Sequence, residues 1–179
     1  MTLTEFQQFT GIPFNKEAGP TVLNGQEELT EGINCQGLVH KIYNYFGHNL
    51  PPSFRSREIF EDEELFFSLS LDNLDPFSLA KLDILIFGRQ DVIDFRKLHL
   101  SVYTGELDKD QNPLIIHSTR VEQQVVIWPL QKFFTFPKYE KLYAIKRLKI
   151  CYITNILFLR LKCHLPNSIS INCFSEGFQ

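Results

Sequence analysis

The order of two hydrophobic periodicities along the chain restricts its fold more than any other feature. Residues 34–47 carry apolar side chains at helical spacing, whereas the patterned segments from residue 82 onward have the short period of strands. Helices that precede strands joined by short turns are typical of an α+β domain, with helices packed on an antiparallel sheet. A chain of 179 residues is long enough for one such domain.

The helix predicted over residues 35–46 has well-marked ends. Asn34 is a good N-cap, because its side chain can accept a hydrogen bond from a free amide of the first turn. Gly47 supplies a stop at the other end. Cys35 therefore falls in the first turn of this helix.

Five strands are predicted further along the chain. Residues 82–87 form an apolar run typical of a buried strand, and residues 97–104 alternate strictly between apolar and polar side chains. This alternation predicts a half-buried strand with His99 on its polar face. The other predicted strands cover residues 114–119, 124–128 and 142–148.

The remaining segments give weaker patterns. Residues 1–33 are rich in turn signals and predict a looping lead-in with one short helix around Glu27–Thr30. A second helix is predicted over residues 53–67, with an acidic run that we interpret as a solvated face. Residues 151–179 show no sustained period, and we expect them to be an appendage to a domain of residues 1–150.

Composition excludes several classes of function. The net charge of −3 argues against a general nucleic-acid coat, and the longest strongly apolar stretch, residues 151–159, is too short to span a membrane. No signal peptide follows Met1, so we expect the chain as written to be cytoplasmic. Acids dominate residues 1–64 and bases dominate residues 130–162. We interpret these as complementary or solvated faces, and a basic flank that attracts an anionic substrate is the alternative.

The number and spacing of the cysteines, and the absence of nucleotide or metal motifs, limit which cofactors can be expected. The four cysteines form no regular framework, so a disulfide scaffold is not expected. A zinc site could be drawn from the C-terminal segment, but no C-x-x-C pair anchors it. We therefore expect no metal and no organic cofactor. The residues of that rejected site are Cys151, Cys163, His164 and Cys173.

Three residues remain as candidates for chemistry, namely Cys35, His99 and His117. A helix start can lower the pKa of a thiol to about 3.5–7.5, from about 8.5 when free. An imidazole can take the thiol proton and return it to a leaving amine, provided that a third polar group orients it. His99 and His117 lie on adjacent predicted strands, so contact between them is easy. The alternative, three ordinary structural side chains, stays open at this point.

Four segments share their order with the motifs of one family. Residues 34–39 (NCQGLV) precede residues 82–87 (LDILIF), 99–105 (HLSVYTG) and 115–118 (IIHS). They resemble the D-C-S-G-L-V, G-D-L-V-F-F and H-V-G-I-Y-L-G motifs and the following strand of the NlpC-type cell-wall peptidases, which are papain-like cysteine peptidases. The resemblance covers about residues 30–150.

The resemblance implies a papain-like fold with Cys35 as nucleophile, His99 as general base and acid, and His117 as the orienting residue. It implies a peptide or peptidoglycan-fragment substrate, with cleavage of an amide bond in bacterial cell-wall stem peptides, typically next to D-glutamate. Neither a nucleic-acid partner nor a membrane is implied, and the oligomeric state stays open.

Some family positions differ. Asn34 replaces an Asp, Gln36 a Ser, and Leu82 and Ser101 each a Gly, while no Tyr precedes Tyr43. Two alternatives therefore accompany the peptidase. One is a cytosolic thiol hydrolase or acyltransferase with another substrate, and the other is a catalytically silent binding or assembly module of the same fold.

Overall fold

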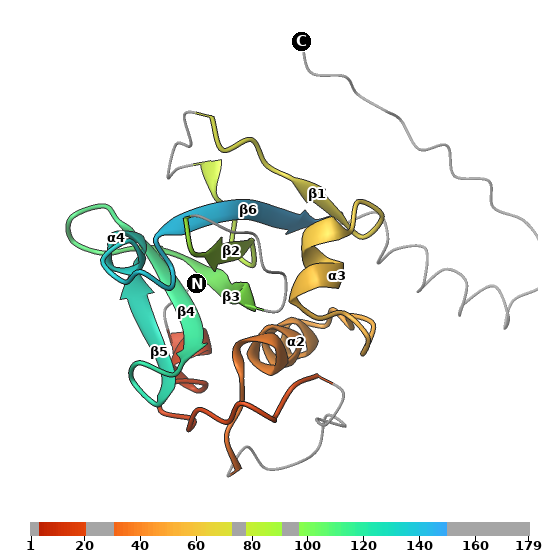
Figure 1. Ribbon diagram of the computed structural model, residues 1–179, viewed down its shortest axis with the longest axis horizontal. Coiled ribbons are helices and arrows are strands. Elements are labelled where there is room, and N and C mark those ends of the chain that lie inside the picture. Colours follow the sequence, from red (N-terminus) through yellow and green to blue (C-terminus); the bar gives the residue numbers. More distant parts are fainter. Residues whose placement is uncertain (1–3, 21–30, 73–77, 91–96, 150–179) are drawn as a thin grey trace, which may run out of the picture. The chain divides into compact units, whose positions relative to one another are not determined.

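The computed structural model describes residues 4–20, 31–72, 78–90 and 97–149, which all lie in one compact unit. Its centre is a six-stranded sheet in the order β1-β6-β2-β3-β4-β5 (Figure 1). Every neighbouring pair is antiparallel. The strands are β1 (Phe66–Ser68), β2 (Ile84–Gly88), β3 (His99–Leu107), β4 (Pro113–Thr119), β5 (Gln124–Pro129) and β6 (Lys141–Leu148).

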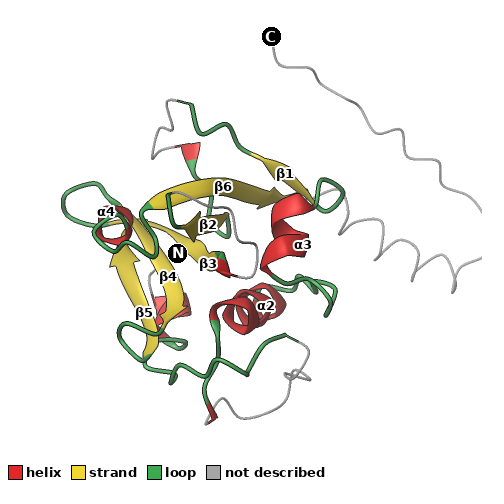
Figure 2. Ribbon diagram, viewed as in Figure 1, coloured by secondary structure: helices red, strands yellow, loops and turns green. Residues whose placement is uncertain are grey.

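Four helices accompany the sheet in the described part of the chain (Figure 2). They are α1 (Thr4–Gln7), α2 (Cys35–Tyr45), α3 (Ser56–Glu61) and α4 (Leu130–Phe133). The α+β class with an antiparallel sheet, predicted from the order of the periodicities, is confirmed. None of the helices in the described ranges combines the length and hydrophobicity needed to cross a bilayer.

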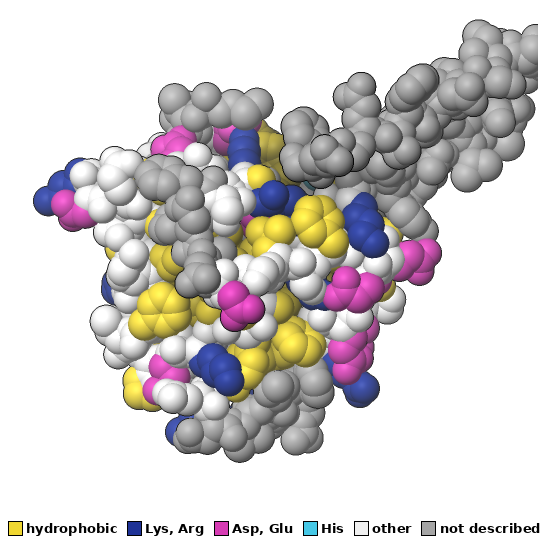
Figure 3. All heavy atoms as spheres, turned by 90° about the horizontal axis from the view of Figure 1, so that it is seen from above, with side chains coloured by type: hydrophobic (Ala, Val, Ile, Leu, Met, Phe, Trp, Pro, Cys, Tyr) yellow, Lys and Arg dark blue, Asp and Glu magenta, His cyan; other side chains and the backbone are white. Residues whose placement is uncertain are grey.

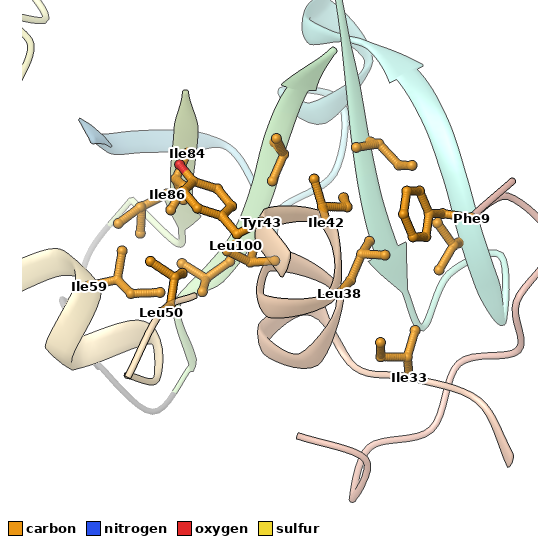
Figure 4. Packing of buried hydrophobic residues seen from close by; sticks show 14 of the residues in the cluster. Phe9, Ile33, Leu38, Ile42, Tyr43, Leu50, Ile59, Ile84, Ile86 and Leu100 are labelled. Carbon is orange, nitrogen blue, oxygen red and sulfur yellow. The ribbon is translucent and has the colours of Figure 1, made fainter. Parts of the chain in front are cut away.

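Helix α2 packs against one face of the sheet, over β3 and β4. Its buried side chains Leu38 and Ile42 belong to one apolar cluster with Leu100 of β3 (Figure 4). Because successive residues of a strand point to opposite faces, the other face carries a second cluster. That cluster includes Phe87, Tyr103, Trp128, Phe133 and Tyr139.

The strand that carries His99 differs from the prediction. Alternation predicted a half-buried strand, yet both faces of β3 are buried from His99 to Thr104. Helix α2 covers the Leu100 side, and the aromatic side chains Phe133 and Tyr139 cover the His99 side. The prediction of a polar face for His99 is therefore wrong, because α4 and the segment that follows it supply a second covering layer.

The second predicted helix is also shorter than expected. Residues 53–67 were predicted as one helix, but α3 ends at Glu61 and β1 begins at Phe66. The Asp62 carboxylate ends the helix by accepting hydrogen bonds from the amides of Leu65 and Phe66, at 2.8 and 3.0 Å. The next residues then pair with β6. The predicted short helix of residues 27–30 and the predicted appendage of residues 151–179 lie outside the described residues.

The lead-in runs beside β5, at the edge of the sheet. Its backbone exchanges hydrogen bonds with this strand: the Gly11 amide donates to the Val125 carbonyl at 2.9 Å, and the Val125 amide donates to the Ile12 carbonyl at 2.8 Å. Phe14 then forms a bridge with Ile33, just before α2. Residues 11–14 of the lead-in are therefore held between the edge of the sheet and the residue two positions before α2.

Acidic and basic segments of the sequence meet in the fold. Lys146 of β6 is fully buried, and its Nζ lies 2.8 Å from the Glu63 carboxylate. Arg147 pairs with Asp83 at 2.6 Å. On the face drawn in Figure 3, basic and acidic side chains are interspersed with hydrophobic ones. The Lys146–Glu63 pair joins the acidic and basic segments and supports their interpretation as complementary, whereas Asp83 lies outside the acidic segment.

Candidate active site

The start of α2 is held by one side chain that bonds in two directions. The Asn34 Oδ1 accepts a hydrogen bond from the Gly37 amide at 2.9 Å, which is the predicted N-cap. Its Nδ2 donates to the Lys16 carbonyl at 3.0 Å, and its backbone amide donates to the Ala18 carbonyl at 3.0 Å. Cys35, the first residue of α2, is thus fixed to both the helix and the lead-in.

The helix start lies against the ends of two strands. Strands β3 and β4 pair at Val102↔Ile116 and at Tyr103↔Ile115. Closer to the helix, the Ser118 hydroxyl donates to the Ile33 carbonyl at 2.6 Å, a buried contact. The Leu100 amide is near enough to the Cys35 sulfur to act on its ionisation. The same ends of these strands carry His117 and His99.

His99 and His117 contact each other directly. The Nε2 of His99 lies 2.8 Å from the Nδ1 of His117, and both residues are buried. The Tyr139 ring is centred 4.4 Å from the His99 ring. The rings of Trp128 and Phe133 are centred 4.4 and 4.5 Å from that of His117. The structure therefore brings the two predicted histidines together inside an aromatic enclosure.

One nitrogen in this enclosure lacks a partner. The Nε2 of His117 is buried and has no hydrogen-bond partner in the described structure. An unsatisfied buried donor or acceptor typically costs about 1–3 kcal/mol, but an N–H can be partly satisfied by an aromatic face, whereas a lone pair cannot. The aromatic surroundings of His117 therefore favour a proton on its Nε2.

Burial sets the charge state of all three candidate residues. It raises the pKa of the Cys35 thiol, against the opposing effects of the Leu100, Gln36 and Cys35 amides and of the Lys138 charge. Burial and Lys138 lower the pKa of His99 to about 3. Burial, with the charges of His99, Lys132 and Lys138, lowers the pKa of His117 well below its usual range. At neutral pH the resting site holds a neutral thiol and two neutral imidazoles.

The expected lowering of the cysteine pKa is therefore wrong. The helix start does act in the predicted direction, through the amides of its first turn. Desolvation of the thiolate outweighs it, because the sulfur is buried beside the start of β3 and against the apolar cluster under α2. The residue as a whole remains half-buried.

The Cys35 thiol lies near His99 but is not hydrogen-bonded to it. Among the described residues, no hydrogen bond links Cys35 to His99. The amide of Leu100, which follows His99 in β3, acts on the ionisation of the sulfur. Burial raises the pKa of Tyr139, whose ring lies on His99; the Thr119 hydroxyl opposes this rise and Cys35 adds to it. The three predicted residues thus gather at one end of the β3–β4 pair.

Sequence reasoning missed the residues that enclose the histidines. Tyr139 is fully buried, and its hydroxyl lies 2.9 Å from the Thr119 Oγ1. Phe133 stacks on Phe87, with ring centroids 4.5 Å apart. The aromatic density of residues 133–139 (FFTFPKY) was the available signal. It has no regular period, which is why no element was predicted there.

The described residues include no group of three His, Cys, Asp or Glu side chains arranged to hold a metal ion. The cysteines and the histidine of the rejected zinc site lie beyond residue 149, outside those residues. Comparison with family models and with curated proteins finds no match to this chain.

Replacing Asn34 should separate its two roles. We expect Asn34→Ala, which removes the cap and the bond to Lys16, to lower the free energy of unfolding by about 1–2 kcal/mol. Asn34→Asp keeps the cap, so its loss should be smaller. Its negative charge beside the thiolate should slow alkylation of Cys35 by a neutral reagent. Urea unfolding and alkylation kinetics measure the two effects, and equal losses of stability would contradict the assigned cap.

Acid should destabilise the fold through the buried imidazoles. An unfolded histidine titrates near pH 6.5, whereas folded His99 does so at about 3. As the pH falls from 6.5 towards 3, the unfolded chain takes up protons that the folded chain does not. The free energy of unfolding should therefore fall by up to about 1.4 kcal/mol per pH unit for each such imidazole. Urea unfolding across this range measures the slope.

Two variants show which histidine causes the pH dependence of the free energy of unfolding. His117→Gln removes one buried imidazole. It should therefore remove the contribution of about one proton from the slope of the free energy of unfolding against pH. His48→Gln is the matched control, because His48 is only half-buried and its replacement should change the slope less. A His117→Gln slope equal to that of the parent chain would mean that the pKa of His117 does not change on folding.

Proposed function

We propose that this chain is a papain-like cysteine hydrolase, an amidase or endopeptidase that cleaves an amide bond in bacterial cell-wall stem peptides. The observation that carries the proposal is the hydrogen-bonded pair of His99 and His117, at 2.8 Å, beside the strand ends that receive Cys35. A nucleophile, a proton carrier and an orienting group are the three parts that thiol-dependent acyl transfer requires.

The reaction would proceed in two balanced halves. The Cys35 sulfur attacks the amide carbonyl while its proton passes to His99. The carbon–nitrogen bond then breaks, His99 gives that proton to the leaving amine, and the acyl group stays on sulfur as a thioester. Water next attacks the thioester, with His99 taking one of its protons and returning it to the sulfur. The carboxylic acid leaves and the thiol is restored.

This chemistry requires one particular tautomer of each imidazole. The Nε2 of His99 is engaged with His117, so Nδ1 is the nitrogen left to take the thiol proton. For Nδ1 to be a base, the His99 proton must sit on Nε2 and be donated to the Nδ1 of His117. His117 must then carry its own proton on Nε2, the nitrogen enclosed by aromatic rings. The enclosure favours that same arrangement.

The backbone at Leu82 supports the family resemblance. Leu82 has φ of 75°, in the left-handed region that glycine adopts at little cost. The G-D-L-V-F-F motif has glycine at the matching position. A left-handed conformation is uncommon for a leucine, so its presence at the position of the motif glycine supports the proposed resemblance.

The positions at which this chain differs from the family motifs affect the choice of substrate rather than the proposed reaction. Gln36, where the family has Ser, donates to the Ser56 hydroxyl at 2.9 Å. Ser56 in turn donates to the Leu98 carbonyl, next to His99. The side chain beside the nucleophile is thus occupied in joining α2 to α3. A thiol hydrolase or acyltransferase with a substrate from outside the cell wall is accordingly the alternative within the same chemistry.

A catalytically silent module of the same fold is favoured by a different observation. The resting thiol is protonated, and His99, with its pKa at about 3, is a weak base. An enzyme with this site depends on substrate binding to strengthen the base or to exclude water further. A silent module needs no such step, so turnover decides between the two.

Three substitutions test the assigned roles. We expect Cys35→Ala and His99→Ala each to abolish release of new amino groups from purified peptidoglycan or muropeptides, because each removes a reacting group. His117→Asn should be milder, with kcat reduced about 10²-fold or less, because an amide oxygen can still accept from His99. Mass spectrometry of the muropeptides measures turnover. Activity in Cys35→Ala would exclude the thiol mechanism, and inactivity of the parent chain on every cell-wall substrate would favour the alternatives.

The tautomers can be observed without a substrate. In ¹⁵N-labelled protein at neutral pH, we expect His99 and His117 each to carry the ring proton on Nε2. Imidazole nitrogen chemical shifts distinguish the two tautomers directly. His48→Gln assigns the signal of an outlying histidine by its loss. A proton on the Nδ1 of His99 would contradict its role as the base.

A further inference from the structure

Lys138 places an exposed positive charge beside the candidate active site. It lies in the segment between α4 and β6, and its Nζ is 5.4 Å from the centre of the Tyr139 ring. That ring lies on His99, with centroids 4.4 Å apart. The Lys138 charge acts on the ionisation of Cys35, His99 and His117 alike. The Lys138 ammonium therefore lies on the outer side of the Tyr139–His99 ring pair, and its charge reaches all three candidate residues.

No carboxylate in the described part of the chain pairs with Lys138. The nearby Glu140 instead accepts a hydrogen bond from the Gln90 amide at 2.9 Å. Lys132, the other cation that acts on His117, lies 3.2 Å from the Glu122 carboxylate, which balances its charge. Lys138 is thus the cation near the thiol whose charge is left for an external anion.

We propose that Lys138 forms an anion-binding subsite beside the Cys35 thiol, and that the substrate carries a carboxylate close to the amide bond that is cleaved. A lysine ammonium is a compact charge on a flexible stem, suited to meeting a carboxylate whose exact position varies between substrates. The statement about the substrate rests on the proposed function. The anion preference of the thiol does not, since it follows from the position of the charge.

The preference can be measured on the thiol itself with two small reagents. Iodoacetate is an anion and iodoacetamide is its neutral counterpart, and both alkylate the same thiolate with loss of iodide. The ratio of their rate constants at Cys35 is therefore independent of the thiol pKa and reports the local potential. Peptide mass spectrometry of the full chain follows each cysteine separately. Cys151, Cys163 and Cys173 then serve as internal references.

A matched series of lysine variants tests the assignment. We expect Lys138→Gln to lower the iodoacetate-to-iodoacetamide ratio at Cys35 by about three- to tenfold, and Lys138→Arg to retain it. Lys141→Gln is the control, because Lys141 lies 4.8 Å from the Tyr143 ring and its charge does not act on the three site residues. In the parent chain, added salt should lower the ratio.

Several outcomes would overturn the subsite. It is wrong if Lys138→Gln leaves the ratio at Cys35 unchanged, or if Lys141→Gln lowers the ratio as much. It is also wrong if neither reagent alkylates Cys35 in the folded chain, because a closed thiol offers no subsite. An absence of turnover on cell-wall peptides, with the ratio lowered by Lys138→Gln, would refute the proposed function and leave the anion subsite standing.

Kinetics on a pair of substrates then tests the carboxylate. For a cleaved peptide and its analogue with that carboxylate converted to a carboxamide, we expect the parent chain to show a lower KM for the carboxylate. Lys138→Gln should remove this difference with kcat changed less than KM. Equal KM values in the parent chain would overturn the substrate class while leaving catalysis by Cys35 intact.

Discussion

The arrangement of the site depends on how the chain enters helix α2. The residue two positions before Cys35 is anchored to β4 by the buried Ser118–Ile33 hydrogen bond, and the next residue caps the helix and holds the lead-in. These contacts connect a helix, a strand end and a loop that are far apart in the sequence. Catalytic groups must be held within about 0.5 Å of a productive position, so the proposed role of Cys35 would depend on this anchoring.

Enclosure of this site has an electrostatic consequence. Burial that orders His99 and His117 also removes the water that would stabilise a charged thiolate or imidazolium. The resting site is therefore neutral, and under the proposed mechanism its charges would develop only when a substrate binds. A substrate anion that neutralised Lys138 would relieve one of the two effects that weaken His99 as a base. Recognition and activation would then be linked through one lysine.

Local signals in the sequence were sufficient for part of this structure. The cap at Asn34, the spacing of Leu38 and Ile42, and the cross-strand contact of His99 with His117 follow from rules that involve near neighbours or adjacent strands. The burial of His99 did not follow, because Phe133 and Tyr139 reach it from a segment without a period. The raised pKa of the Cys35 thiol could not be predicted from local rules either, since desolvation depends on the whole enclosure rather than on the helix start.

The hydrogen bonds between the lead-in and β5 have a consequence for the behaviour of the chain in the cell. A strand at the edge of a sheet offers free amides and carbonyls to any extended segment of another molecule. Here residues 11–14 occupy part of that edge. Proteolytic loss of the lead-in would expose this edge as a template for aggregation and would release the start of α2 in the same event. Damaged molecules would then lose the ordered thiol site as they became insoluble, so that few would persist in solution with a displaced thiol.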